Sequence, residues 1–317
     1  MKKWAINTIA LSEQARMQRQ IFVTNIIMSV SEQKQRRIYD AKNKSTLPGK
    51  LVRAEGDPSV GDPAVNEAYD GAGWTYDLYK DVYERNSVDD KGMTLDSTVH
   101  YSEKYDNAFW NGNQMVYGDG DGKIFNRFTI AIDVIGHELT HGVTQYTAKL
   151  EYQDQSGALN EHISDVFGSI VKQYSLKQNT KQADWLIGYG LFTPKIHGIA
   201  LRSMKAPGTA YDDPLIGKDP QPGTLQDYND TSEDNGGVHI NSGIPNRAFY
   251  LIATDIGGYS WDKAGKIWYK TLDLLNAHSN FEDMASCTFE AAGILFGSAE
   301  QESVRKGWDG VGITVKK

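Results

Sequence analysis

The sequence lacks the features that mark several large classes of protein. It contains one cysteine, Cys287, among 317 residues, so an intramolecular disulfide and a cysteine-rich zinc cluster are both excluded. No uninterrupted apolar run approaches the roughly 20 residues that a membrane-spanning helix needs. The formal net charge is -8, and no basic cluster alternates with aromatic residues as in a nucleic-acid-binding surface. We therefore expect no nucleic-acid partner and no membrane partner, and any metal ion must be held by His, Asp or Glu.

A classical secretion signal is also absent. Met1 to Lys3 give a positive start, but the segment from Ser12 to Arg16 interrupts the following apolar stretch before a signal-peptide core forms. We therefore expect a bacterial protein that stays in the cytoplasm or leaves the cell by an unconventional route. Nothing in the sequence indicates an oligomer, so we expect a monomer.

Changes in composition divide the chain into three parts. Residues 1–37 end in a polar run and are interpreted as an extension outside the main body. Residues 38–147 are rich in Tyr, Asp and Gly, and their alternating apolar and polar stretches predict a β-rich lobe with some helix. Residues 148–317 are mainly helical by pattern. Apolar residues at helical spacing predict helices over residues 129–146, 158–174, 244–256, 261–275 and 281–296.

The motif with the clearest chemistry lies on the first of these helices. His137 and His141 are four residues apart, so both imidazoles project from one face and can reach a single metal ion. Glu138 then projects beside the metal without binding it. Because such a His pair also arises by chance, the motif needs support from elsewhere in the chain.

That support lies on the second predicted helix, where Glu161 and Asp165 are one turn apart. If this helix packs against the first, Glu161 completes a set of two His and one Glu and leaves a fourth position for water, as in a catalytic zinc site. Asp165 would accept a hydrogen bond from the second ring nitrogen of His137. The alternative is that both carboxylates merely cap or solvate a helix, and the neighbouring His pair favours zinc.

With these residues in place, the sequence resembles the thermolysin family of zinc metallopeptidases, and in particular its protealysin subgroup, over nearly all of residues 38–312. The resemblance rests on four separated blocks in the family's order: Asn107 to Gly112, His137 to His141, Gly157 to Asp165, and Asp234 to Gly243. It implies an α+β fold of the zincin type, with a β-rich N-terminal lobe, a mainly helical C-terminal lobe and the zinc site in the cleft. It also implies a neutral endopeptidase with one catalytic zinc ion, made as a precursor with a short propeptide.

The resemblance assigns chemical roles to single residues. It implies that Glu138 is the general base, which takes a proton from the attacking water and passes it to the leaving amine. His239 and Tyr152 match donors to the oxyanion of the tetrahedral intermediate, and Asp234 orients His239.

It also implies how a peptide substrate is held. Asn107, the Ala108 backbone and Arg202 match groups that hydrogen-bond the substrate main chain. Taken singly, each apolar residue of the matching pocket fits a hydrophobic core at least as well, but as a set they predict cleavage on the amino side of bulky hydrophobic residues. The matching positions are Phe125, Phe128, Val134, Ile187, Leu191 and Leu201.

The family's paired calcium site is the main departure. Asp133 and Asp184 match its carboxylates, but Lys172 stands between them, and an ammonium group there would repel a cation. Leu186 and Tyr189 also replace oxygen ligands. We therefore predict that the paired site is absent and that calcium dependence does not carry over.

Two other functions fit parts of the pattern. A catalytically silent zinc-binding module would keep His137, His141 and Glu161 but has no use for Glu138 or His239. A zinc hydrolase acting on a non-peptide substrate would not need residues such as Asn107 that read a peptide backbone. Both are weaker than the endopeptidase interpretation.

Overall fold

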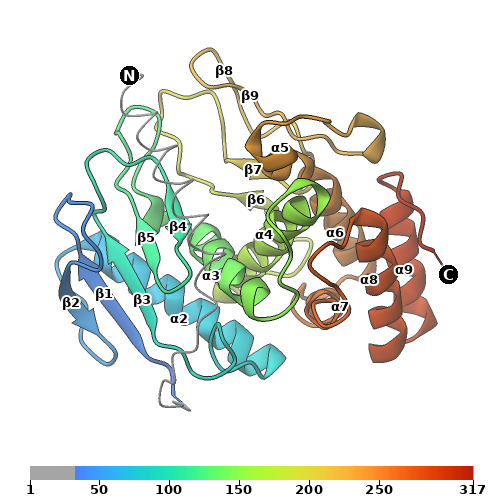
Figure 1. Cartoon of the computed structure of the whole chain (residues 1–317), viewed down its shortest axis with the longest axis horizontal. Coiled ribbons are helices and arrows are strands. Elements are labelled where there is room, and N and C mark those ends of the chain that lie inside the picture. Colours follow the sequence, from blue (N-terminus) through green and yellow to red (C-terminus); the bar gives the residue numbers. More distant parts are fainter. Residues whose placement is uncertain (1–32, 317) are drawn as a thin grey trace.

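The alternating segments in the first part of the chain form a five-stranded mixed sheet, as the computed structural model of residues 33–316 shows (Figure 1). The sheet has the order β2-β1-β3-β5-β4, so β4 lies at one edge. β1 pairs antiparallel with β2 and parallel with β3, while β5 pairs parallel with β3 and antiparallel with β4. The strands are β1 (Arg36–Asp40), β2 (Lys50–Ala54), β3 (Leu95–Val99), β4 (Ala108–Trp110) and β5 (Met115–Tyr117).

One long helix, α2 (Pro63–Tyr83), covers this sheet. The sequence predicted some helix in this lobe but not its position. Asp62 caps its N-terminus by accepting a hydrogen bond from the Ala64 N–H, and Pro63 occupies the first turn, where its missing N–H costs nothing. The helix contacts the sheet on one side and α3 and α4 on the other. A wide part of its surface is therefore buried, including Gly71 and Gly73.

The rest of the chain is mainly helical, as the sequence pattern predicts, and the predicted helices begin and end within a few residues of the observed ones. The helices are α3 (Ile132–Tyr146), α4 (Asp154–Leu176), α5 (Asp234–Asn241), α6 (Gly243–Ile256), α7 (Ala264–Thr271), α8 (Phe281–Leu295) and α9 (Ser298–Asp309). Four two-residue strands lie between α4 and α5 and form two two-stranded sheets, β6 (Leu186–Ile187) with β7 (Arg202–Ser203) and β8 (Asp212–Asp213) with β9 (Gly217–Lys218). Within residues 33–316, no helix is long and apolar enough to cross a membrane.

Helices α3 and α4 lie side by side between the sheet and the C-terminal helices (Figure 1). Their backbones approach closely at two glycines. A methyl group on Gly168 would lie 2.3 Å from the Asp133 carbonyl oxygen, and one on Gly136 would lie 3.0 Å from the Val171 side chain. No larger residue fits at Gly168 without moving one helix away from the other.

The N-terminal boundary predicted after residue 37 falls inside strand β1. Residues 1–32 of the predicted extension lie outside the described residues. From Gln33 onward the chain is attached to the body: the Lys34 ammonium lies 2.7 Å from Asp77, and the Arg36 guanidinium lies 2.6 Å from Glu55.

A buried ion cluster further ties α3 to α4. The Lys172 ammonium of α4 lies 2.8 Å from Asp133 of α3 and 2.9 Å from Asp184, and it donates a 2.7 Å hydrogen bond to the Leu186 carbonyl oxygen. The Asp133 side chain is buried. The lysine therefore supplies the positive charge that these two carboxylates need.

Replacing Lys172 should cost stability, because Lys172→Met leaves the buried Asp133 carboxylate without its cation. We expect a loss of about 3 kcal/mol in the free energy of unfolding, measured by urea denaturation. Exposed Lys181 offers a matched control, and Lys181→Met should change stability little. Added calcium should not raise the melting temperature of the wild-type protein, and a clear rise would contradict the predicted absence of the paired site.

A second ionic link joins the end of β3 to α2 and to the loop after β5. His100 places Nδ1 2.9 Å from Asp119 and Nε2 2.8 Å from the capping residue Asp62. The hydrogen bond to Asp119 has the largest effect on the pKa of His100. Together with the hydrogen bond to Asp62, it outweighs the opposing effect of burial and raises this pKa to about 9. Both nitrogens donate when the ring is protonated.

The His100 link predicts a specific pH dependence of stability. Because the folded pKa, about 9, lies above the ordinary value of 6.5, the contribution is fully present below pH 6.5 and is lost as the pH rises through about 9. Urea unfolding at a series of pH values should show wild type losing stability over this range relative to His100→Gln. A constant difference between the two proteins would contradict the link.

Candidate metal centre and active site

A cavity of about 220 Å³ opens where α3, α4 and the edge strand β4 meet. It brings together most of the residues singled out from the sequence, although they come from segments far apart in the chain. Its lining residues are Asn107, Ala108, Phe109, Phe128, Val134, His137, Glu138, His141, Tyr152, Glu161, Leu201, Arg202 and His239.

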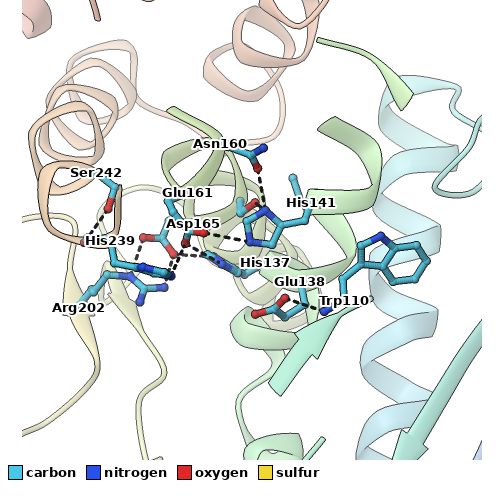
Figure 2. Close-up of polar contacts among 12 residues, drawn as sticks. Trp110, His137, Glu138, His141, Asn160, Glu161, Asp165, Arg202, His239 and Ser242 are labelled. Carbon is cyan, nitrogen blue, oxygen red and sulfur yellow. Dashed lines mark hydrogen bonds and ion pairs between the residues drawn. The ribbon is translucent and has the colours of Figure 1, made fainter. Parts of the chain in front are cut away.

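Three side chains converge at the floor of the cavity (Figure 2). The Nε2 atoms of His137 and His141 lie 3.3 Å from the two separate carboxylate oxygens of Glu161. Ligand atoms that hold one zinc ion tetrahedrally at about 2.0–2.2 Å are themselves about 3.3–3.5 Å apart. Glu161 Oε2 is buried and has no hydrogen-bond partner among the described residues. The donor set and its spacing therefore fit a zinc ion.

Glu138 is the other carboxylate near the two imidazoles. Potential ligand atoms of His137, Glu138 and His141 lie within 4.8 Å of one another. Glu138, however, accepts a 3.0 Å hydrogen bond from the backbone N–H of Trp110 on β4, so its carboxylate is turned toward the sheet (Figure 2). This geometry favours Glu161 as the third ligand and keeps Glu138 beside the metal position.

The outer nitrogens of both imidazoles are also held. His137 Nδ1 lies 2.8 Å from Asp165, and His141 Nδ1 lies 2.7 Å from Asn160 Oδ1. Asp165 was singled out from the sequence, but Asn160 was missed. Its signal was its position directly before Glu161, which places it on the same turn of α4.

The surrounding charges favour a cation. Burial alone would lower the pKa of His137, but the neighbouring carboxylates of Asp165 and Glu161 raise it to about 9. Burial likewise disfavours the carboxylate form of Asp165, yet Arg202 and His137 hold its pKa well below the ordinary range. The cavity floor thus keeps two buried carboxylates ionised, and positive charge beside them is stabilised.

Tyr152 and His239 lie on the opposite side of Glu161 from β4. The Tyr152 hydroxyl donates to Glu161 Oε1 and lies 3.2 Å from His239 Nε2. Asp234 lies 2.7 Å from His239 Nδ1 and accepts a 2.8 Å hydrogen bond from the His239 backbone N–H. These two contacts to one carboxylate fix the ring so that Nε2 faces the cavity.

Arg202, expected to bind the substrate main chain, forms a two-pronged ion pair with Asp165. Its Nε and Nη2 atoms donate hydrogen bonds of 2.8 and 2.6 Å to the two oxygens of Asp165. It also lines the cavity, as do Asn107 and Ala108. Its planar group can therefore brace Asp165 and meet a ligand from the same place.

The six apolar positions predicted to form a side-chain pocket divide into two groups. Phe128, Val134 and Leu201 line the cavity. The other three do not line it: Ile187 and Leu191 are fully buried, and Phe125 packs its ring 5.4 Å from that of Phe128. Phe125 and Leu191 pack in the same apolar cluster as the three lining residues, whereas Ile187 belongs to the core of the helical lobe. Phe109 also lines the cavity and was not among the predicted pocket residues.

Comparisons with known proteins match almost the entire chain. Residues 12–145 match the sequence profile described as the catalytic domain of thermolysin metallopeptidases, and residues 148–313 match that of their alpha-helical domain. The first match begins within the predicted N-terminal extension.

Individual relatives agree with these profiles. An extracellular metalloprotease of Pectobacterium carotovorum subsp. carotovorum is 58% identical over 287 residues, covering 90% of this chain and 83% of the relative. Protease PrtS of Photorhabdus sp. (strain Az29) is 55% identical, covering 91% and 79%. The solved precursor of protealysin from Serratia proteamaculans superimposes with a TM-score of 0.89 at 56% identity, covering 92% of this chain and 91% of that one.

One expectation from the sequence is wrong in the light of these relatives. A location in the cytoplasm, or an unconventional route out of the cell, was predicted because no classical signal was found. The Pectobacterium relative, 58% identical, is named an extracellular metalloprotease, which overturns that prediction.

Proposed function

This chain belongs to the thermolysin family of metallopeptidases, and from that premise we propose, residue by residue, how it cleaves peptide bonds. The predicted family, the two-lobed α+β fold, the zinc cofactor and the metalloendopeptidase activity are confirmed by these matches. The protein is a zinc-dependent neutral endopeptidase, and its substrates are peptides or proteins. The silent module and the non-peptide hydrolase are therefore set aside.

We assign His137, His141 and Glu161 as the zinc ligands. The observation that carries this assignment is the 3.3 Å spacing of both imidazole nitrogens from Glu161, together with the buried Oε2 atom that lacks a hydrogen-bond partner among the described residues. When bound, zinc supplies a Lewis acid that acidifies water and polarises a carbonyl group. Asp165 and Asn160 hold the two imidazoles with their Nε2 lone pairs toward the metal position.

Glu138 is proposed as the general base. The Trp110 N–H holds one carboxylate oxygen, so the group stays at the cavity wall and does not turn away. From there it takes a proton from the attacking water and delivers it to the leaving nitrogen. Tyr152 and His239 are proposed to donate hydrogen bonds to the oxyanion that develops on the carbonyl, and Asp234 orients the His239 ring.

A peptide substrate is proposed to lie along β4. Among the described residues this strand lies at an edge of the sheet, and Asn107 and Ala108 of this segment line the cavity, where a substrate main chain can meet them. Arg202 approaches from the opposite lobe and donates to a substrate carbonyl. Main-chain recognition of this kind accepts many sequences.

The residue after the scissile bond is proposed to enter the apolar wall of Phe128, Val134 and Leu201. All three side chains of the wall are apolar, and the fully buried Leu191 packs in the same cluster. Bulky hydrophobic side chains are therefore preferred.

We propose a catalytic lobe of residues 38–147 and a helical lobe of residues 148–317, and the division between the two matched profiles supports the boundary between them. Residues 1–37 are proposed as a propeptide, since the similar solved structure is a precursor. The protein is further proposed to act outside the cell, which its recovery from the culture medium would test. It is also proposed to be a monomer, which light scattering would test.

The general-base proposal predicts that Glu138→Gln loses roughly 10²–10⁴-fold in kcat on a blocked peptide with Leu after the scissile bond. Glutamine keeps the shape of the side chain and its bond to the Trp110 N–H but cannot take the proton. Zinc content, measured by atomic absorption, should equal that of wild type, and removal of zinc by a chelator should abolish wild-type activity.

Glu302→Gln is the matched control, because Glu302 is exposed and pairs with Arg305 away from the cavity. It should leave activity unchanged. Intact mass of the same samples reports on the propeptide: wild type should lose an N-terminal segment on incubation while Glu138→Gln retains it. Full activity in zinc-loaded Glu138→Gln would contradict the assignment.

The pocket proposal predicts a preference among peptides that differ only after the scissile bond. Wild type should cleave the Leu peptide roughly 10–200-fold faster than the Ala peptide in kcat/KM. Leu201→Ala enlarges the pocket and should shift the preference for the residue after the scissile bond from Leu toward Phe. Leu176→Ala, at an exposed position outside the cavity, is the control, and an equal shift there would contradict the assignment.

A further inference from the structure

A row of hydrogen bonds runs from Asp165 away from the cavity into the helical core. Asn246 of α6 donates a 2.8 Å hydrogen bond from Nδ2 to Asp165 Oδ2. Its Oδ1 lies 2.8 Å from Nδ1 of His162 on α4, and His162 Nε2 accepts a 2.8 Å hydrogen bond from the indole N–H of Trp268 on α7. Three helices thus meet in one chain of contacts that ends on the carboxylate beside His137. His162 lies in the middle of it.

The chemistry of each group fixes the direction of this row. An indole N–H can only donate, so His162 Nε2 must be the acceptor and the proton of the neutral ring must lie on Nδ1. That N–H requires an acceptor, so the amide of Asn246 must turn its oxygen to His162 and its NH₂ to Asp165. Every donor therefore points toward Asp165, and no member can reverse alone without placing two donors or two acceptors against each other.

Burial makes this arrangement costly to disturb. Trp268, His162 and Asp165 are fully buried, and Asn246 is 1% exposed. An unpaired polar group at such a place loses its hydrogen bond and has no water to replace it, which destabilises the fold. A flipped Asn246 amide would in addition set its oxygen against the Asp165 carboxylate.

Asp165 depends on this donor. It accepts four hydrogen bonds: His137 and Arg202 reach Oδ1, while Arg202 and Asn246 reach Oδ2. Arg202 reaches Asp165 from the cavity side and Asn246 from the core. Among the described residues, Asn246 is thus the donor that holds Asp165 from the core side.

We propose that Trp268, His162 and Asn246 are positioning residues that lock the orientation of Asp165 and, through it, the tautomer and aim of His137 toward the metal. The proposal deepens the function proposed above, because it rests on His137 as a zinc ligand. The readout is metal binding, not turnover.

The simpler explanation is that these residues only stabilise the core. Trp268 packs its ring 4.8 Å from Phe249 and 6.4 Å from Trp308, so any change here costs stability. A neighbouring pair supplies the control: the indole N–H of Trp308 donates a 2.8 Å hydrogen bond to Thr288. Thr288→Val leaves a buried tryptophan N–H without its acceptor, as His162→Leu does, but breaks no link to Asp165.

The test compares four proteins: wild type, His162→Leu, His162→Gln and Thr288→Val. Glutamine is the rescue variant, since its amide offers one donor to Asn246 and one acceptor to Trp268. The zinc dissociation constant is measured by competition with a chromophoric chelator, the melting temperature by calorimetry, and the metal geometry by the visible spectrum of the cobalt-substituted protein. If His162→Leu does not fold, Trp268→Phe removes the donor at the far end of the row instead.

We expect His162→Leu to weaken zinc binding roughly tenfold and to change the cobalt spectrum. His162→Gln should recover most of the affinity, and Thr288→Val should lose stability with unchanged zinc binding. Wild-type zinc affinity in His162→Leu, or an equal loss in Thr288→Val, would overturn the proposal. Zinc binding is measured without turnover, so a negative result for the row of hydrogen bonds would not affect the proposed catalytic mechanism. A zinc-loaded wild type without peptidase activity would contradict the catalytic mechanism alone.

Discussion

The active site depends on how closely α3 and α4 approach. Two imidazoles on one helix and one carboxylate on the next meet at 3.3 Å only if the helix backbones nearly touch. Gly168 permits this, since a methyl group there would lie 2.3 Å from a carbonyl oxygen of α3. Lys172, one turn further along α4, then ties the two helices by its ion pair with Asp133. The packing of two helices and the geometry of the metal site are thus one constraint.

The site also depends on two ionised carboxylates that are buried away from water. Glu161 and Asp165 are almost fully buried, and both remain ionised because cationic or hydrogen-bonding groups surround them. A site of this kind holds a dication without large rearrangement, because its donors are already oriented. The price is a demand for exact hydrogen-bond direction, which the row from Trp268 to Asp165 satisfies from the core side.

Much of the metal site could be predicted from the sequence, because the relevant residues are only a few positions apart along single helices. The His pair and the one-turn separation of Glu161 from Asp165 each lie on one helix, and the helical period places them on one face. The predicted helices around them also formed. Helix α2 was harder, since Gly71, Gly73 and four tyrosines give its segment a low intrinsic helix propensity. Three of the six predicted pocket residues do not line the cavity, because the sequence does not distinguish an apolar residue that lines a cavity from a fully buried one such as Leu191. Asn160 and Asn246 were missed, because an amide shows its importance only when its two hydrogen-bond partners are known.

The central claim is that one zinc ion is held by His137, His141 and Glu161, with Glu138 beside it. Anomalous diffraction from crystals of the zinc-loaded protein, recorded on both sides of the zinc absorption edge, tests this most directly. The account predicts a peak about 2.0–2.2 Å from Nε2 of both imidazoles and from a Glu161 oxygen. A peak bound by Glu138 in place of Glu161, or one displaced to the cluster around Lys172, would contradict it.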